Sequence, residues 1–216
     1  MKSVLVTGGT VRLGAAIAAR LRADGWRVIT SSHRADAGVD IVADLAEPTG
    51  AAKLYAAALR LLDGTPPDAL VNNAALFTGD EAAIRAVNLE APKKLTMMMV
   101  GREAGVGAVV NVLDAKALDG NRLQSTAADS YRSSKQALAE FTKTSAATFA
   151  ATLRVNGVAP GPVMAPTDVH EKAGEMLLDR RPTADDVAAA VSYLLSAEAV
   201  TGVTIPVDAG QHLIEG

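Results

Sequence analysis

Short apolar runs alternate along the chain with longer segments whose apolar residues have helical spacing. The short runs are rich in β-branched residues, which favours buried strands. The predicted strands are Ser3–Thr7, Arg27–Ser31, Asp40–Ala43, Ala69–Asn72, Ala108–Leu113, Leu153–Val158 and Val203–Val207. Apolar residues in the segments between them recur about every three or four positions, which favours helices. The predicted helices are Leu13–Asp24, Gly50–Leu62, Asp80–Val100, Ser130–Ala150 and Thr183–Ser196.

This alternation is typical of one fold class. Parallel strands need crossover connections, and helices between the strands supply them on both faces of a sheet. We therefore expect an α/β protein in which residues 1–216 form a single domain, a doubly wound (Rossmann) sheet of about seven parallel strands with helices on both faces. The irregular stretch 160–181 is too long for an ordinary connection, and we expect it to form a flap over a site.

Composition narrows the chemistry that this fold can carry. The chain has 216 residues, of which 49% are hydrophobic, and this content excludes a disordered protein. It has no cysteine, which excludes disulfides and a thiolate nucleophile, and its three histidines lie far apart, so no metal site is expected. The net charge of −3 argues against nucleic-acid binding, and no apolar run is long enough for a membrane span. We expect a cytoplasmic protein without nucleic-acid or membrane partners.

The first predicted strand and helix are joined by Thr7-Gly8-Gly9-Thr10-Val11-Arg12-Leu13-Gly14. Such a turn directs backbone N–H groups and a helix N-terminus toward an anion. Gly8 permits a tight turn, and Gly14 lets the helix pack close to the strand. The common G-x-G-x-x-G fingerprint is not present, so a plain tight connection is an alternative. The position after the first strand favours a site for cofactor phosphates.

Further motifs follow in order along the whole chain: Asn72-Asn73-Ala74-Ala75, Tyr131-x-x-x-Lys135, Pro160-Gly161, Thr201-Gly202 and Val207-Asp208-Ala209-Gly210. With Thr-Gly-x-x-x-Arg-x-Gly at the first turn, this order resembles the short-chain dehydrogenase/reductase family. The resemblance implies an NAD(P)-dependent oxidoreductase. It implies cofactor contacts at Gly8, Thr10, Arg12, Leu13, Gly14, Ser32, His33, Arg34, Asp44, Leu45, Asn73, Ala74, Ala75, Tyr131, Lys135, Pro160, Gly161 and Val163.

The end of the second predicted strand distinguishes NADPH from NADH. A protein that selects NAD places a carboxylate there for the ribose 2′-OH. This chain has Ser31-Ser32-His33-Arg34, whose hydroxyls and guanidinium suit a 2′-phosphate, and Arg12 adds a second cation. We therefore expect NADP(H) as the cofactor. The alternative is that Arg34 lies on a solvated loop without a role in binding.

Tyr131 and Lys135 are four residues apart on one predicted helix, so their side chains share a face. A phenol is a poor acid or base at neutral pH, and a nearby ammonium is expected to lower its pKa. The resemblance implies that Tyr131 is the general acid and that Lys135 binds the nicotinamide ribose. It also implies that Asn88 holds a water joined to Lys135; the alternative is a buried Asn88 that bonds backbone groups.

Asp114 stands where the family usually has a catalytic serine. A carboxylate cannot donate to a substrate carbonyl unless it is protonated, but it can accept from an N–H-rich heterocycle or relay a proton. The stretch from Asp114 to Tyr131 is longer than is usual in the family, and residues around 121–127 are expected to bulge out. Ser125, Thr126 and Ser130 are lower-ranked alternatives for the missing hydroxyl.

A narrower resemblance rests on Arg12 in the glycine turn, on His33-Arg34 and on Asp114. Together these residues resemble the pteridine reductases and the dihydromonapterin-reductase-like members of the family. Phe77 matches an aromatic residue that stacks on the pterin in those proteins, although core packing is an alternative. The resemblance implies a substrate site of Arg12, Phe77, Asp114 and Tyr131.

We expect an NADPH-dependent reductase that transfers hydride to a pterin-like or other small carbonyl or imine substrate, with Tyr131 as the proton donor. One alternative is a general ketoreductase for a sugar, acyl or steroid carbonyl. A second alternative is an NADP(H)-binding sensor without turnover. Because family members are commonly dimers or tetramers, a homodimer or homotetramer is expected.

Overall fold

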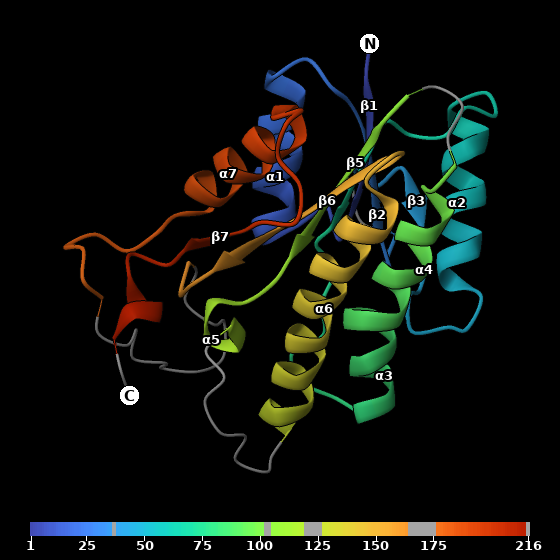
Figure 1. Ribbon diagram of the computed structural model, residues 1–216. Coiled ribbons are helices and arrows are strands. Elements are labelled where there is room, and N and C mark those ends of the chain that lie inside the picture. The colour runs from blue at the N-terminus through green and yellow to red at the C-terminus, as the bar shows by residue number, and fades with distance from the viewer. Residues whose placement is uncertain (36–37, 102–104, 119–126, 164–175, 215–216) are drawn as a thin grey trace.

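The computed structural model describes residues 1–35, 38–101, 105–118, 127–163 and 176–214, and Figure 1 shows their arrangement. A 7-stranded sheet with the strand order β3-β2-β1-β4-β5-β6-β7 forms the centre, and every neighbouring pair of strands is parallel. The strands are β1 Ser3–Thr7, β2 Arg27–Ser32, β3 Ile41–Val42, β4 Ala69–Asn72, β5 Gly107–Val112, β6 Leu153–Pro160 and β7 Thr204–Val207. The predicted parallel sheet is confirmed.

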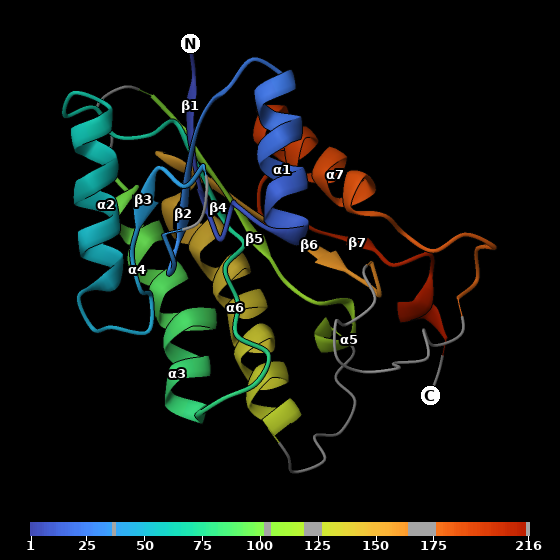
Figure 2. The same cartoon turned by 180° about the vertical axis from the view of Figure 1, so that it is seen from behind.

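Helices cover both faces of this sheet, as the two opposite views show (Figures 1 and 2). The helices are α1 Arg12–Ala23, α2 Gly50–Leu61, α3 Glu81–Arg85, α4 Ala91–Met98, α5 Ala115–Leu118, α6 Ala127–Phe149 and α7 Ala184–Ser196. Helices α1 and α7 pack on one face, where Val4 and Val6 of β1 point, whereas Leu5 points to the face that carries α2 and α4. This alternation follows from the period of two along a strand.

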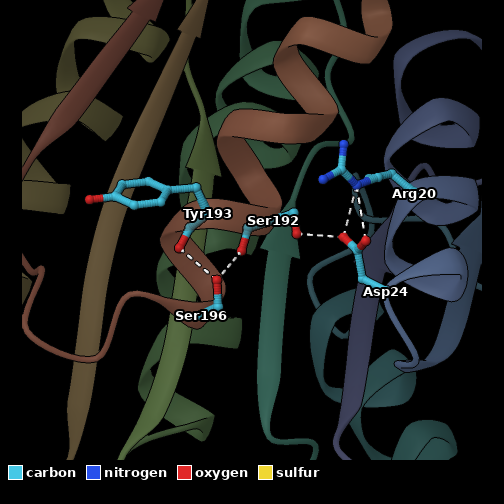
Figure 3. A network of polar contacts seen from close by, with 5 residues as sticks. All are labelled: Arg20, Asp24, Ser192, Tyr193 and Ser196. Carbon is cyan, nitrogen blue, oxygen red and sulfur yellow. Dashed lines mark hydrogen bonds and ion pairs between the residues drawn. The ribbon is translucent and has the colours of Figure 1, made fainter.

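Polar contacts at one end of the α1–α7 pair join the two helices (Figure 3). Arg20 donates to both carboxylate oxygens of Asp24, and Ser192 Oγ donates to Asp24 Oδ2 over 2.5 Å. The hydrogen bond from Ser192 is the main cause that holds the pKa of Asp24 below its usual value, although burial opposes it. The ring of Tyr193 points away from this network. These contacts lie at the C-terminal end of α1, away from the carboxyl ends of the strands.

The predicted helix over Asp80–Val100 is interrupted by a π-turn, Ala86–Glu90, between α3 and α4. The cause lies at Pro92, near the start of α4, because proline has no N–H to bond the carbonyl of Asn88 one turn earlier. The Ala91 N–H bonds the Ala86 carbonyl instead, which is the wider spacing of a π-turn. The sequence pattern also missed α5, a short helix directly after Asp114.

Some predictions fall outside the described residues. Most of the predicted flap, residues 164–175, lies there, as do residues 121–126 of the predicted bulge. None of the helices in the described part of the chain is long and apolar enough to cross a membrane.

Candidate active site

The glycine turn between β1 and α1 is closed by Asn73, which follows β4. Asn73 Nδ2 donates to the carbonyls of Thr7 and Gly8, each over 3.0 Å. Thr7 Oγ1 in turn accepts the backbone N–H groups of Asn73 and Ala74, also over 3.0 Å. A Cβ at Gly14 would overlap the Gly8 carbonyl oxygen and come within 2.6 Å of Asn73 Nδ2. Only glycine therefore fits at the first turn of α1, which agrees with the close approach predicted there.

Arg12 is the first residue of α1 and has a φ of +49°, in the left-handed region. This conformation suits glycine and costs a residue with a side chain about 1 kcal/mol or more. The Arg12 side chain is exposed beside the turn. A strained residue of this kind persists where its surroundings hold it, and such residues cluster at ligand sites.

The end of β2 presents a hydroxyl and two cationic or titratable side chains. Ser32 is buried, and its Oγ accepts the backbone N–H of Arg34 over 3.1 Å, while His33 and Arg34 are exposed. The nearby carboxylate of Asp40 is engaged elsewhere, because its Oδ2 accepts from both the backbone and the hydroxyl of Thr30. Arg34 places an exposed positive charge at this strand end.

Asp44 and Leu45, predicted to contact the cofactor, follow β3. Asp44 is exposed and its Oδ1 accepts the Ala46 N–H over 2.8 Å, whereas Leu45 is buried in the core. Gly50 packs against the Asp44 carbonyl so closely that a side chain would overlap it. The backbone of this pair is fixed at the same edge of the sheet as the glycine turn.

Tyr131 and Lys135 lie on α6 and face the end of β5. The Tyr131 hydroxyl donates to Asp114 Oδ2 over 3.0 Å. Lys135 is buried, and its Nζ donates to the Val112 carbonyl over 2.7 Å and lies 5.8 Å from the centre of the Tyr131 ring. The other oxygen of Asp114 accepts the Lys116 N–H over 2.9 Å, so the start of α5 orients the carboxylate.

The pKa of Tyr131 corrects one prediction. Burial raises the pKa of Tyr131 well above its ordinary value, and the charge and hydrogen bond of Asp114 raise it further. The expected lowering by Lys135 is therefore wrong for this arrangement, because burial and a neighbouring carboxylate outweigh an ammonium that does not touch the hydroxyl. Burial lowers the pKa of Lys135 to about 8, although the charge of Asp114 opposes that shift. Tyr131 consequently holds its proton at neutral pH.

Asn88, on the π-turn, is fully buried and joins two segments of the site. Its amide exchanges two hydrogen bonds with the backbone of Leu76, over 2.8 Å and 2.9 Å. Its Nδ2 also donates to Ser134 Oγ over 3.1 Å, and Ser134 Oγ donates to the Tyr131 carbonyl over 2.6 Å. The side chain of Asn88 thus bonds backbone and Ser134, and the water-mediated role toward Lys135 stays a prediction. Sequence reasoning missed Ser134, although its position three residues after Tyr131 places it on the same face.

Phe77 directly follows the segment that Asn88 holds. Its ring centre lies 4.8 Å from that of Tyr131 with an interplanar angle of 58°, and its side chain is 60% exposed. Core packing is therefore wrong for Phe77, because a core residue is not exposed to this degree. The Phe77 ring is thus exposed next to the Tyr131 side chain.

Three predicted cofactor residues lie at the end of β6 or shortly after it. Pro160 ends that strand, Gly161 donates its N–H to the Val207 carbonyl over 3.0 Å, and Val163 packs against the core. Of the alternative hydroxyls, Ser125 and Thr126 lie outside the described residues, and Ser130 lies on α6 one residue before Tyr131. The structure thus gathers the candidate residues at the carboxyl ends of β1, β2, β4, β5 and β6, where doubly wound sheets bind nucleotides.

A parallel sheet with a glycine turn at its first crossover and a tyrosine–lysine pair beyond β5 defines the class of dinucleotide-dependent oxidoreductases. The family model described as short chain dehydrogenase matches residues 2–177. The chain belongs to the short-chain dehydrogenase/reductase family, and the predicted class of enzyme is confirmed.

Individual relatives differ in what they are named for. Protein FixR of Bradyrhizobium diazoefficiens is 30% identical over 98% of this chain and 87% of its own length. Glucose 1-dehydrogenase 2 of Bacillus subtilis is 29% identical over 98% of this chain and 95% of its own. The crystal structure of FolM alternative dihydrofolate reductase 1 of Brucella canis, complexed with NADP, superposes with a TM-score of 0.80, at 30% identity and with coverage of 99% and 95%.

Proposed function

We propose that the chain is an NADPH-dependent reductase that transfers hydride to a pterin-like or other small carbonyl or imine substrate, with Tyr131 as the proton donor. One observation carries the proposal: Tyr131 bonds Asp114 and contacts the exposed ring of Phe77. This combination offers a proton donor, an acceptor for N–H groups and an aromatic face within one small region.

The glycine turn fits a dinucleotide. Gly14 lets the start of α1 pack directly on the Gly8 carbonyl, and the amide of Asn73 fixes the turn by bonding the carbonyls of Thr7 and Gly8. The residues that would hold NADP(H) are Gly8, Thr10, Arg12, Leu13, Gly14, Ser32, His33, Arg34, Asp44, Leu45, Asn73, Ala74, Ala75, Tyr131, Lys135, Pro160, Gly161 and Val163. Arg34 and Arg12 would supply positive charge for the 2′-phosphate and the other phosphates. The NADP in the FolM crystal structure supports this choice of cofactor.

The bound cofactor supplies a hydride, so that its nicotinamide is oxidised while a C=N or C=O carbon of the substrate is reduced. Tyr131 gives its hydroxyl proton to the substrate nitrogen or oxygen, which becomes strongly basic as the hydride arrives. The raised pKa of Tyr131 keeps this proton in place until then. Lys135, fixed by the Val112 carbonyl, provides a positive charge 5.8 Å from the ring centre of the phenolate that remains.

The substrate class follows from Asp114 and Phe77. Asp114 can accept N–H groups of a pterin ring once the Tyr131 hydroxyl turns its proton from Asp114 to the substrate. Phe77 offers a flat apolar face beside the same tyrosine, which suits a planar heterocycle. The FolM relative, a dihydrofolate reductase by name, supports a substrate of this class.

A general ketoreductase is the second candidate function, and the glucose 1-dehydrogenase relative favours it. The two functions are separated by NADPH oxidation with dihydrobiopterin against a panel of small ketones and sugars. Preferred turnover of dihydrobiopterin supports the pterin assignment. Turnover of ketones alone would exclude it, and cofactor binding without any turnover, unchanged by Tyr131→Phe, would instead identify a sensor.

A further inference from the structure

The turn that follows β7 is built around one buried carboxylate. Asp208 is 2% exposed, and its Oδ1 accepts the Gly210 N–H over 3.0 Å. Its Oδ2 accepts the backbone N–H of His212 over 2.7 Å and lies 2.8 Å from the ring nitrogen Nδ1 of the same residue. A carboxylate oxygen can only accept a hydrogen bond. We therefore assign the His212 tautomer that carries a proton on Nδ1, because this proton can be donated to Asp208. Asp208 is thus satisfied entirely by this turn.

The carboxylate holds a backbone that would otherwise be unfavourable. Ala209 and Gly210 are consecutive residues in the left-handed region, with φ values of +56° and +81°. A residue with a side chain adopts this conformation only where other contacts stabilise it. As a result the Ala209 carbonyl is aimed at the chain before α7, where it accepts the N–H groups of Leu177 and Leu178 over 3.0 Å and 3.1 Å. Gly210 also packs on Leu177.

The same turn also contacts two segments of the chain that belong to the candidate site or adjoin it. Gly161, a predicted cofactor residue, packs directly on Asp208, because a Cβ at Gly161 would come within 2.6 Å of Asp208 Cβ. The 3₁₀ turn Gln211–Leu213 packs against α5, which begins directly after Asp114, and Figure 1 shows the two side by side. Leu177, Leu178 and Leu213 are all exposed and give this edge an apolar surface.

We propose that Asp208, together with His212, is a positioning residue for the substrate side of the site. It fixes the turn on which Leu177 and Leu178 dock, and thereby sets the affinity for substrate while leaving the proton transfer and the binding of cofactor to other residues. The role rests on the proposed reductase activity. The Asp208 carboxylate does not bond Tyr131, Lys135 or Asp114, whereas the turn it holds packs against α5 and carries the apolar edge. Its contact with Gly161 is made by Cα and Cβ, which Asp208→Asn keeps, so cofactor binding is expected to persist in that variant.

The test compares Asp208→Asn with Asp63→Asn, an exposed carboxylate at a positive φ on the loop after α2. Asp208→Asn is expected to speed hydrogen exchange of the Leu177 and Leu178 amides about tenfold or more. It is also expected to raise the KM for substrate about tenfold, with kcat and the NADPH Kd changed less than about threefold. Asp63→Asn is expected to change none of these quantities.

A second pair of variants covers the case in which Asp208→Asn does not fold. His212→Asn can keep a side-chain N–H toward Asp208 and is expected to behave like the wild type, whereas His212→Ala loses that donor and is expected to raise KM and amide exchange. Unchanged exchange in Asp208→Asn and His212→Ala, or equal losses in kcat and NADPH binding, would overturn the proposal. If the wild type reduces only ketones, the pterin assignment fails, while the same KM comparison on a ketone still decides the role of Asp208.

Discussion

At the glycine turn, the described side chains bond backbone atoms, whereas around Tyr131 side chains also bond one another. Asn73 bonds the carbonyls of Thr7 and Gly8, and Thr7 Oγ1 accepts the backbone N–H groups of Asn73 and Ala74. The tyrosine end depends on bonds between Tyr131 and Asp114 and between Asn88 and Ser134. The glycine turn requires the close approach of Gly14 to the Gly8 carbonyl, whereas the surroundings of Tyr131 require particular functional groups. Substitutions should therefore separate cofactor binding from catalysis.

Tyr131→Phe should have the largest effect, because it removes the proton donor and leaves the glycine turn intact. The rate of NADPH oxidation should fall about 10²–10⁴-fold, while the Kd of NADPH stays within about threefold of the wild type. Steady-state kinetics and fluorescence titration measure the two quantities. Tyr193→Phe, an exposed tyrosine on α7, is the matched control and should change neither. A Tyr131→Phe variant that retains the wild-type rate would remove Tyr131 from the mechanism.

Gly14→Ala should weaken the binding of cofactor at the glycine turn. Its Cβ would overlap the Gly8 carbonyl, so the turn must open, and the affinity for NADPH should fall about 100-fold. Gly64→Ala is the control: it has open space around it but a φ of +82°, so it should cost about 1 kcal/mol of stability without weakening cofactor binding. Equal NADPH affinities in the two variants would show that the turn does not bind the cofactor.

Arg34→Asp should change which of the two cofactors, NADPH or NADH, is preferred. Losing a charge-assisted bond to the 2′-phosphate is worth about 1.5–3 kcal/mol, so the preference for NADPH over NADH should fall about 10–100-fold. The ratio of kcat/KM for the two cofactors measures it. Arg22→Asp, an equal charge reversal at an exposed position on α1, should leave the ratio unchanged. An unaltered preference in Arg34→Asp would exclude this residue from phosphate recognition.

The pH dependence of stability should give the smallest effect. The pKa of Lys135 is about 8 in the folded chain and lies near 10.4 when unfolded, so between these values the unfolded chain binds more protons. The free energy of unfolding should therefore rise with pH from about 8 to about 10, by at most about 1.4 kcal/mol per pH unit from this group. Above about pH 10 the raised pKa of Tyr131 acts in the opposite direction.

Urea unfolding at several pH values measures this dependence. Lys135→Met removes the titrating group, so the slope between about pH 8 and pH 10 should decrease in that variant. A slope that is the same with and without Lys135 would contradict the burial of its ammonium group.

The sequence pattern predicted the sheet and the glycine turn because their causes are local. Apolar runs define the strands, and Gly14 lies six residues from the carbonyl it must approach. The sign of the pKa shift of Tyr131 could not be predicted, since it depends on burial and on Asp114, seventeen residues away. The partners of Asn88 are equally remote, and its place on a π-turn follows from Pro92. The sequence motifs identified the candidate residues, but the hydrogen bonds that these residues make could be found only from the folded structure.

The most direct test of the account is a crystal structure of the chain with NADP⁺ and a dihydropterin. We expect the pterin ring to lie against Phe77, with a ring N–H bonded to Asp114 and the Tyr131 hydroxyl within about 3.2 Å of the nitrogen that takes the proton. A pterin bound away from Phe77 and Asp114, or a dinucleotide bound elsewhere than at the glycine turn, would contradict it.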